Sequence, residues 1–410
     1  MSASGAQLGV VAAGHPVSAG AGADALRDGG NAVDAALAAM LASLTCEPLL
    51  TGLGAGGYML VATPDGAATL LDFFVEAPGR GHPDPTRPAG ELIPVSVSFG
   101  DAVQVFHVGA ASVGTFGFPA GVCEAAARYA RLGLERLVRP AAALAREGVE
   151  LNPQQAYIVE ILSGTVTSTA EAAAMFAPGG RLLRAGDRIR QPELGDALER
   201  LGSDGAAPFY TGDVGDAIAD WLAPRGGLLS RADLAAYQVA EREPLRAAYR
   251  GREVLINPPP SAGGLLISRA LAMLDARRPH GQRTAPTVAE LVEVMERTQS
   301  ERTPEFLAGL HDPQFVAGFR ALPVGRLGST THVAALDRDG WACSVTCSNG
   351  SASGVIVPGT GVHLNNMLGE QDLNPTGWHR HPPGRRMPSM MAPAIVRRDG
   401  APELVVGSAG

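Results

Sequence analysis

The feature that most constrains the fold is a hairpin pattern between Thr330 and Asn349, centred on Asp339-Gly340. Asp-Gly is a strong signal for a two-residue turn between antiparallel strands. Beyond the turn, two sets of residues alternate with the period of a strand buried on one face. The sets are Trp341, Cys343, Val345 and Cys347, and Ala342, Ser344, Thr346 and Ser348. The pattern therefore predicts a β-hairpin with Thr330 at its open end.

The register of this hairpin follows from its turn. Pairing Arg338 with Trp341 makes paired residue numbers sum to 679, which puts Thr330 opposite Asn349 and beside Ser348. A different turn type would shift the pairing by a residue or two. Either way, hydroxyl and amide groups reach Thr330. Cys343 and Cys347 share one strand face, and we expect them to be core residues rather than a pair of metal ligands.

A second hairpin is predicted around Asp399-Gly400, joining residues 394–396 to 404–406. Its paired numbers sum to 799, which brings Ser389 opposite Gly410. Ser389 and the glycine-rich tail 407–410 would then share one end of the sheet, where backbone N–H groups could stabilise an oxyanion. Two ordinary hairpins that end in loops are the alternative.

The rest of the chain mixes helices with short strands. Apolar residues spaced by three or four predict a buried helix over 23–44, although Gly29-Gly30-Asn31 allows two helices with a turn. Other helices are predicted over 121–132, 135–147, 192–201, 214–222 and 265–274, and strands over 8–13, 58–62 and 244–256. Residues 275–329 read as a polar helical connector.

Composition excludes several classes of protein. The 410 residues are 46% apolar, which indicates a globular chain, and the net charge of −8 without a basic run argues against nucleic acid or an anionic membrane as partner. No apolar run approaches the ~18–20 residues of a membrane span, and the first residues lack the basic region of a signal peptide. With four scattered cysteines, we expect a cytoplasmic protein with reduced thiols.

Gly328-Ser329-Thr330-Thr331-His332 suggests a particular chemistry. A threonine freed by self-cleavage carries its nucleophile and its base on one residue, because the hydroxyl attacks while the new α-amino group accepts the proton. Such an amine titrates at about 7.7–8.0, which suits a base near neutral pH.

Other motifs are explained by structure alone. The glycines of 47–57 lack the register of a nucleotide loop, so a tight turn near a buried site is preferred. The prolines of 257–264 suit a rigid turn before a helix. His379 and His381, with Glu370, could be metal ligands, but no third ligand has a recognisable spacing and a solvated loop is preferred.

Taken together, these residues resemble the γ-glutamyltranspeptidase family of the N-terminal-nucleophile hydrolase superfamily. The motifs that carry the resemblance occur in order along nearly the whole chain, at 31–36, 47–57, 72–78, 114–121, 257–264, 328–332, 365–366, 388–393 and 407–410. The resemblance implies an α+β fold, a four-layer αββα sandwich. It also implies self-cleavage between Ser329 and Thr330 into a large-subunit region, 1–329, and a small-subunit region, 330–410, which together form one domain.

The resemblance also assigns roles to site residues. Thr330 matches the nucleophile, Ser348 stands where a second threonine supports the new amine, and Gly410 matches an oxyanion-hole glycine. Asn349 lies near an asparagine that contacts substrate, and Ser329, Thr330 and His332 form the processing site. The family continues beyond the position of Gly410, so further residues are expected after it.

Four departures concern the substrate. Phe74 replaces the arginine that holds the γ-glutamyl carboxylate, and a phenyl ring cannot imitate that contact. Ser389-Met390 replaces a Ser-Ser pair. Met367 stands in a polar position, and Glu370 replaces an aspartate that receives the substrate amine. The substrate pocket is therefore expected to be more apolar than that of the family, which argues against glutathione.

Several functions stay open at this point. The leading hypothesis is a self-processing hydrolase that acts on a small acyl substrate without a cofactor or metal. Its setting could be a biosynthetic pathway such as antibiotic alkylproline formation, where family homologues resemble hydrolases that cleave a C–C bond beside a 2-oxo acid. Hydrolysis or transfer of a γ-glutamyl group is the alternative, and an unprocessed, non-catalytic homologue is another. The expected partners are the two subunits of one precursor and a higher homo-oligomer.

Overall fold

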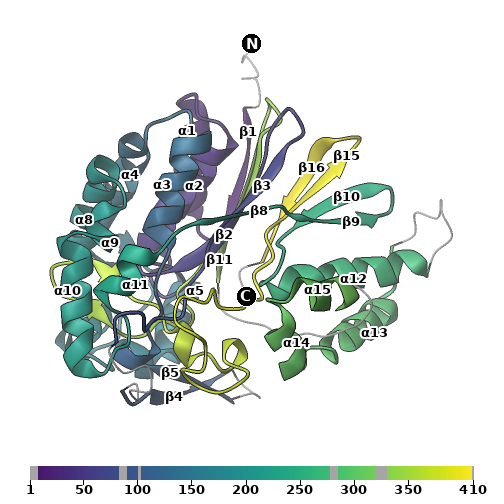
Figure 1. Ribbon diagram of the computed structural model, residues 1–410. Coiled ribbons are helices and arrows are strands. Elements are labelled where there is room, and N and C mark those ends of the chain that lie inside the picture. The colour runs from purple at the N-terminus through teal and green to yellow at the C-terminus, as the bar shows by residue number, and fades with distance from the viewer. Residues whose placement is uncertain (1–7, 83–89, 100–102, 278–284, 320–329, 409–410) are drawn as a thin grey trace, which may run out of the picture.

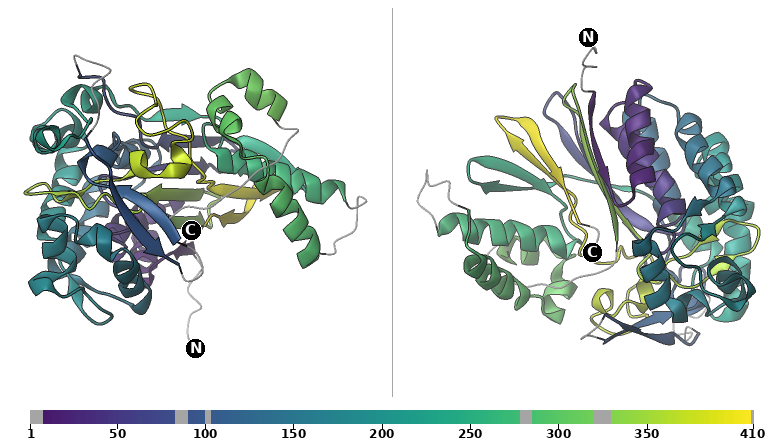
Figure 2. Two further views of the ribbon diagram at one scale, coloured as in Figure 1. Left: turned by 90° about the horizontal axis from the view of Figure 1, so that it is seen from below. Right: turned by 180° about the vertical axis from the view of Figure 1, so that it is seen from behind.

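A computed structural model describes residues 8–82, 90–99, 103–277, 285–319 and 330–408. Its elements form four layers, helices, sheet, sheet and helices, which follow one another across Figure 1. The αββα arrangement expected from the sequence is therefore confirmed. The view from behind in Figure 2 shows the same order of layers.

The first sheet has six strands in the order β1-β11-β12-β2-β3-β8, and its pairs are antiparallel. The strands are β1 (Gly9–Ala13), β11 (Thr331–Asp337), β12 (Ala342–Ser348), β2 (Gly56–Ala62), β3 (Ala68–Phe73) and β8 (Ala240–Arg242). The predicted strands near 8–13 and 58–62 are confirmed. The predicted hairpin β11–β12 lies between β1 and β2, so strands from both sides of residue 329 form one sheet.

The second sheet has four antiparallel strands in the order β16-β15-β10-β9. They are β16 (Ala401–Val406), β15 (Ala394–Arg398), β10 (Arg252–Ile256) and β9 (Leu245–Tyr249). Between the two sheets lies a cluster of buried side chains that includes Tyr58, Leu60, Leu255 and Ile395. The predicted strands of 244–256 and the second hairpin are confirmed.

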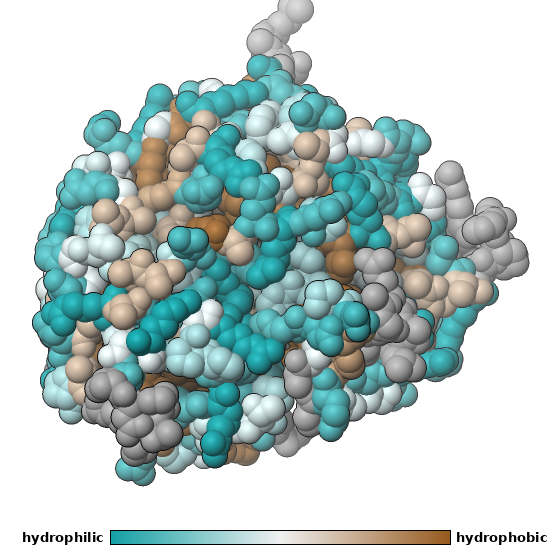
Figure 3. Space-filling view, in the orientation of Figure 1, coloured by the Kyte–Doolittle hydropathy of each residue, from teal (hydrophilic) through white to brown (hydrophobic). Residues whose placement is uncertain are grey.

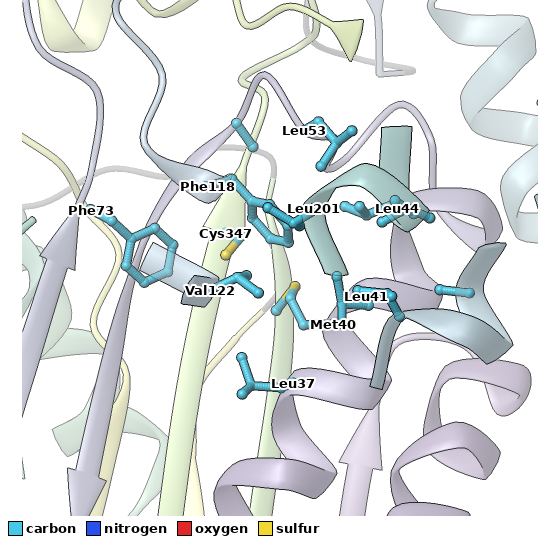
Figure 4. Close-up of a cluster of buried hydrophobic side chains, with 14 of the residues drawn as sticks. Leu37, Met40, Leu41, Leu44, Leu53, Phe73, Phe118, Val122, Leu201 and Cys347 are labelled. Atoms are coloured by element: carbon cyan, nitrogen blue, oxygen red, sulfur yellow. The ribbon is translucent and has the colours of Figure 1, made fainter. Parts of the chain in front are cut away.

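The helices of the first outer layer cover the six-stranded sheet. They are α1 (Pro16–Arg27), α2 (Ala32–Cys46), α3 (Phe118–Tyr129), α4 (Leu134–Glu147), α8 (Pro192–Asp204), α9 (Ala207–Tyr210), α10 (Asp213–Leu222) and α11 (Arg231–Ala236). The chain around 29–31 does turn between two helices. Asn31 caps α2, with Asp34 completing the capping box, and every residue of α2 is buried. Because most of its side chains are small and apolar on all sides, α2 can pack between the first sheet and the other helices. Figure 4 shows Leu37, Met40 and Leu41 of α2 in this position.

Four helices form the other outer layer: α12 (Ala262–Ala276), α13 (Val288–Gln299), α14 (Pro304–Gly309) and α15 (Pro313–Phe319). They confirm the predicted helix near 265–274, and α13, α14 and α15 lie within the described part of the predicted helical connector. The smaller elements are β4 (Ile93–Ser98), β5 (Val103–Val108), β6 (Val149–Glu150), α5 (Pro153–Ile161), α6 (Ser163–Val166), α7 (Ala170–Phe176), β7 (Arg188–Ile189), β13 (Ile356–Val357) and β14 (Val362–His363). Of these, β4 and β5 lie at the lower end of Figure 1.

The register predicted for the first hairpin is wrong by one residue. Thr331 pairs with Cys347 and Leu336 with Ala342, so paired numbers sum to 678. The reason is the turn: the Asp337 carboxylate accepts hydrogen bonds from the backbone N–H groups of Asp339 and Trp341, and Gly340 has φ 92°. These contacts stabilise a three-residue loop in place of the two-residue turn. Extended by one residue, the register puts Thr330 opposite Ser348.

The second hairpin departs from prediction further along. The pairs next to Asp399-Gly400 sum to 799 as predicted, but a bulge between Val396 and Arg397 moves the remaining pairs to 800. The predicted sum therefore holds only for the pairs next to the turn. Ser389 forms a parallel bridge with Ser261, and Gly410, its predicted partner, lies outside the described residues, so that pairing stays a prediction.

No helix among the described residues is both long and apolar enough to cross a bilayer. On the face drawn in Figure 3, hydrophobic residues occupy small separate areas within a largely hydrophilic surface.

Candidate active site

The candidate site begins where β11 starts. Thr330 directly precedes this strand and is only 8% exposed. The next residue, Thr331, donates a hydrogen bond from Oγ1 to Glu47 Oε2 at 2.9 Å. This bond ties the start of β11 to the end of α2. Ser329, the residue before the proposed cleavage point, lies outside the described residues.

The two faces of the hairpin differ in chemistry. Val333, Val345 and Cys347 belong to the core beneath the first helical layer. On the opposite face, His332 pairs with Thr346, and Thr330 and Ser348 follow at the open end. Ser344 on this face donates a hydrogen bond to the Val406 carbonyl of β16 at 3.3 Å. The hydroxyl-bearing face therefore points toward the second sheet.

His332 joins this face to the end of β16. Its Nδ1 lies 2.8 Å from Thr346 Oγ1, while its Nε2 is buried with no hydrogen-bond partner among the described residues. Burial lowers the pKa of His332 to about 4, so the ring is neutral at pH 7. A Cβ on Gly407 would come within 2.3–2.7 Å of ring atoms, so a larger residue there would displace the ring. Gly407, directly after β16, thus lies against the ring.

Ser348 and Asn349 close the open end of the hairpin. Ser348 Oγ accepts a hydrogen bond from the backbone N–H of Gly350 at 2.9 Å. Asn349 is fully buried, and its side-chain N–H group donates to the His363 carbonyl at 3.3 Å. Its Oδ1 is buried without a hydrogen-bond partner among the described residues. Ser348 therefore lies across from Thr330 in the extended register, whereas the Asn349 side chain lies against Gly52 and His363.

Met367 and Glu370 lie on a loop that is tied to the same region. The backbone N–H of Asn366 donates to the Asn349 carbonyl at 3.1 Å. Glu370 Oε1 accepts hydrogen bonds from the N–H and the hydroxyl of Ser351. Desolvation raises the pKa of Glu370, and the bonds from Ser351 oppose that rise. Met367 is buried between the two sheets.

The other residues expected to bind substrate occupy different surroundings. Phe74 is buried between the sheets in the same cluster as Met367, and its ring stacks on Tyr58 with centroids 5.4 Å apart. Met390 instead packs against the cluster of α12 and α14. Ser389 lies between these regions, where its Oγ accepts a hydrogen bond from the Met391 N–H. Phe74 and Met367 are thus brought together, and Met390 is not.

A buried arginine beside Phe74 was missed from the sequence. Arg386 donates hydrogen bonds to the Phe74 carbonyl, the Tyr237 hydroxyl and the Gln238 carbonyl. Its guanidinium also lies 3.5 Å from Asp72 and 3.6 Å from Glu76. Arg385-Arg386 is too short to register as a basic patch, and no periodic signal marks the second arginine as buried. Its charge is already matched by two carboxylates.

The histidines considered as metal ligands have structural contacts. His379 Nε2 lies 2.8 Å from the Ala111 carbonyl, and His381 Nε2 lies 2.8 Å from the Leu373 carbonyl. Within the described part of the chain, no group of three or more metal-ligating side chains is found. Both histidines hold a loop in place. Cys343 and Cys347 are fully buried in the core, as predicted.

The amino-acid sequence is similar to those of known proteins over nearly its whole length. Residues 18–410 match the family model described as gamma-glutamyltranspeptidase. The chain is 32% identical to the acylase ACY 1 proenzyme of Pseudomonas sp. (strain SE83), over 98% of this chain and 76% of that protein. It is 30% identical to the glutathione hydrolase proenzyme of Bacillus subtilis (strain 168), over 98% of this chain and 75% of that protein.

Solved structures give a concordant result. The cephalosporin acylase from Bacillus halodurans superposes with a TM-score of 0.78 at 27% identity, covering 97% of this chain and 76% of that one. The γ-glutamyltranspeptidase of Helicobacter pylori superposes with a TM-score of 0.62 at 26% identity, covering 71% and 82%. The matched proteins therefore include both acylases and γ-glutamyl enzymes.

Proposed function

Because this chain belongs to the γ-glutamyltranspeptidase family of N-terminal-nucleophile hydrolases, we propose that it is a self-processing acylase in which Thr330 is the nucleophile. The observation that carries the proposal is the place of Thr330, nearly buried at the open end of the β11–β12 hairpin. There it lies across from Ser348 in the extended register and on the face that points to the second sheet.

Processing is the first chemical step of the proposal. Thr330 Oγ attacks the carbonyl carbon of residue 329, and the peptide C–N bond breaks as an ester forms. Water then hydrolyses the ester, which leaves a carboxylate on residue 329 and a free α-amino group on Thr330. The names of the relatives support this step, because both the acylase and the glutathione hydrolase are proenzymes. The products would remain together, since each contributes strands to the same sheets.

Acyl transfer uses the same hydroxyl a second time. The α-amino group of Thr330 takes the proton of Oγ as that oxygen attacks the acyl carbon of the substrate, and the leaving amine receives the proton. Water then releases the acid from the acyl-enzyme. Ser348 is the candidate to orient the amine. Backbone N–H groups of the tail after Gly407 are candidates to stabilise the oxyanion, a contribution of roughly 3–4 kcal/mol per donor in other enzymes.

The substrate proposed is a small acyl compound other than glutathione. By resemblance, Phe74 stands where the family has an arginine, and the buried Arg386 that bonds to the Phe74 carbonyl pairs with Asp72 and Glu76. Neither residue is thus available to hold a γ-glutamyl carboxylate as the family does. The match to acylases favours an amide bond over the C–C bond of an alkylproline pathway. γ-Glutamyl hydrolysis is the second candidate, favoured by the glutathione hydrolase relatives.

Gel electrophoresis and substrate assays test the proposal. Purified protein should separate into two fragments, the smaller of which begins at Thr330, whereas Thr330→Ala should stay whole. γ-Glutamyl-p-nitroanilide should be a poor substrate compared with simple acyl p-nitroanilides. A single wild-type band with full acylase activity would disprove the mechanism, and robust γ-glutamyl turnover would favour the second candidate.

A further inference from the structure

The carboxyl group of Glu47 lies behind the proposed nucleophile, on the side of the first sheet that faces the helices. Thr331 pairs with Cys347 of the core, so its side chain points to the helical layer, whereas the Thr330 side chain points to the second sheet. Thr331 Oγ1 donates to Glu47 Oε2 at 2.9 Å, and both residues are at most 2% exposed. Glu47 therefore contacts the residue next to the nucleophile, from the face opposite to the Thr330 hydroxyl.

The start of β11 lacks a neighbour that the rest of the strand has. The ladder between β1 and β11 ends at the pair Ala13–Val333. In the described part of the chain, the two residues before Val333 therefore pair with β12 alone. Residues at the free end of a ladder open more readily than residues that are held on both sides. The end of β11 next to Thr330 thus lacks one backbone neighbour, and the hydrogen bond to Glu47 holds it instead.

Glu47 is itself held firmly in place. It caps the C-terminus of α2, where its N–H donates to the Ser43 carbonyl at 2.7 Å. Its carbonyl accepts a hydrogen bond from the Leu50 N–H at 2.9 Å. The Leu50 carbonyl in turn accepts one from the Asn349 N–H at 3.0 Å, directly after β12. The turn 47–50 therefore contacts both strands at the open end of the hairpin, one through a side chain and the other through the backbone.

Among the described residues, no cation pairs with the Glu47 carboxyl group. Burial raises the pKa of Glu47, and the hydrogen bond from Thr331 opposes that rise, so the hydroxyl stabilises the ionised form. Gly14, directly after β1, leaves room for the group, since a Cβ there would come within 2.3 Å of Glu47 Oε1. A buried carboxylate without a cation is unfavourable for stability. Such departures from ordinary packing occur at functional sites, which indicates a task beyond filling the core.

We propose that Glu47 is a positioning residue for the nucleophile. Through Thr331 it fixes the start of β11 in the arrangement in which Thr330 Oγ can attack, first at the peptide bond that is cleaved and then at the substrate. This inference rests on the proposed acylase function and adds the residue that controls the geometry of its nucleophile. A misplacement of about 1 Å can slow a reaction ~100-fold, so loss of the contact should lower the rate of attack rather than substrate binding.

Removal of the Thr331 hydroxyl tests the contact with little change in shape. Thr331→Val should slow self-cleavage at least about tenfold and lower kcat for an acyl p-nitroanilide similarly, while KM changes less than about twofold. Thr331→Ser keeps the donor and should restore both rates to within about threefold of the wild type. Thr45→Val is the matched control. Thr45 is fully buried on α2 and its hydroxyl has no hydrogen-bond partner among the described residues, so both rates should stay unchanged.

Substitutions of Glu47 test the other side of the bond. Glu47→Leu removes the acceptor and should cause the same losses as Thr331→Val. Glu47→Gln keeps an acceptor oxygen and should retain more of both rates than Glu47→Leu. The double variant Glu47→Leu/Thr331→Val should be within about threefold of either single variant, because the two side chains act through one bond. Losses that multiply in the double variant would show that the two residues act independently, and would overturn the inference.

Urea denaturation separates a positioning role from a purely structural one. If Thr331→Val and Glu47→Leu lower only the free energy of unfolding, and folded molecules keep their self-cleavage rate and kcat, Glu47 serves packing alone. The inference is then wrong while the acylase function stands, and the same holds if KM rises at unchanged kcat. If the wild type stays whole and hydrolyses no acyl anilide, or if Thr330→Ala keeps full activity, the proposed function is wrong and the inference is overturned with it.

Discussion

The two faces of the β11–β12 hairpin are made by alternate residues of the same strands, yet they are suited to different tasks. Toward α2 the hairpin presents Val333, Val345 and Cys347, which are packed with little exposure in the largest core cluster. Figure 4 shows Cys347 among Met40, Phe118 and Val122. Toward the second sheet it presents Thr330, His332, Thr346 and Ser348. Hydrogen bonds join His332 to Thr346 and the Ser348 hydroxyl to the Gly350 N–H.

The difference between the two faces explains how the same strands can contribute to stability through one face and to catalysis through the other. The helix-facing side supplies stability, because buried apolar area contributes about 25 cal/mol per Å². The other side carries hydroxyl and imidazole groups in place of apolar ones, and these groups can attack a carbonyl carbon or form hydrogen bonds. Substitutions on the two faces should therefore separate stability from activity.

The largest effect is expected for Thr330→Ala. It should lower acylase activity by at least about 10⁴-fold, or roughly 5.5 kcal/mol in activation free energy, because no other group supplies both hydroxyl and α-amine. Its free energy of unfolding should stay within about 1 kcal/mol of that of an unprocessed wild type, as measured by urea denaturation. Thr330→Ser is the control and should retain processing. Activity that survives in Thr330→Ala would place the chemistry on another residue.

The opposite outcome is expected for Leu37→Ala on α2, in the layer that covers the apolar face. Leu37 is fully buried, so the substitution should cost about 2–5 kcal/mol of unfolding free energy through lost burial and a cavity. Activity per folded molecule should change by less than a factor of about three. If activity falls as steeply as for Thr330→Ala while the fold persists, the two faces are not separable.

The sequence predicts features of the two hairpin faces that depend on neighbouring residues, but not features that depend on residues far apart in the chain. Alternation along β12 correctly predicts the core cysteines and the polar face, because it is a local property of the strand. The exact register is not predicted, because the carboxylate of Asp337 reshapes the turn and a bulge interrupts the second hairpin. The burial of Arg386 depends on partners more than one hundred residues away, such as Tyr237. Likewise, Glu47 and Thr331 meet only in the folded chain.

Ser348→Ala should have an intermediate effect on the polar face. Loss of its hydroxyl removes an acceptor from the Gly350 N–H and the group proposed to orient the Thr330 amine. We expect processing and acylase rates to fall about 100-fold, or roughly 2.7 kcal/mol. Ser344→Ala is the matched control, since Ser344 lies on the same strand and face but bonds to Val406. Ser348→Thr should restore most of the rate, and equal losses in Ser344→Ala would show that only the strand is perturbed.

The smallest effect concerns pH and His332. The folded pKa of about 4 lies below the unfolded value of about 6.5, so between these values the unfolded chain binds more protons. Stability contributed by the neutral ring is therefore fully present above pH 6.5 and is lost as pH falls toward 4. His332→Gln should reduce the drop in unfolding free energy between pH 7 and pH 4.5 by about 1–2 kcal/mol, measured by urea denaturation at each pH. His363→Gln is a useful comparison, because burial also lowers the pKa of His363 to about 4 on a different element, and it should flatten the curve similarly. A His332→Gln curve parallel to the wild type would mean that the pKa of His332 is the same in the folded and unfolded chains, which would remove the buried, pKa-shifted histidine from the account of that face.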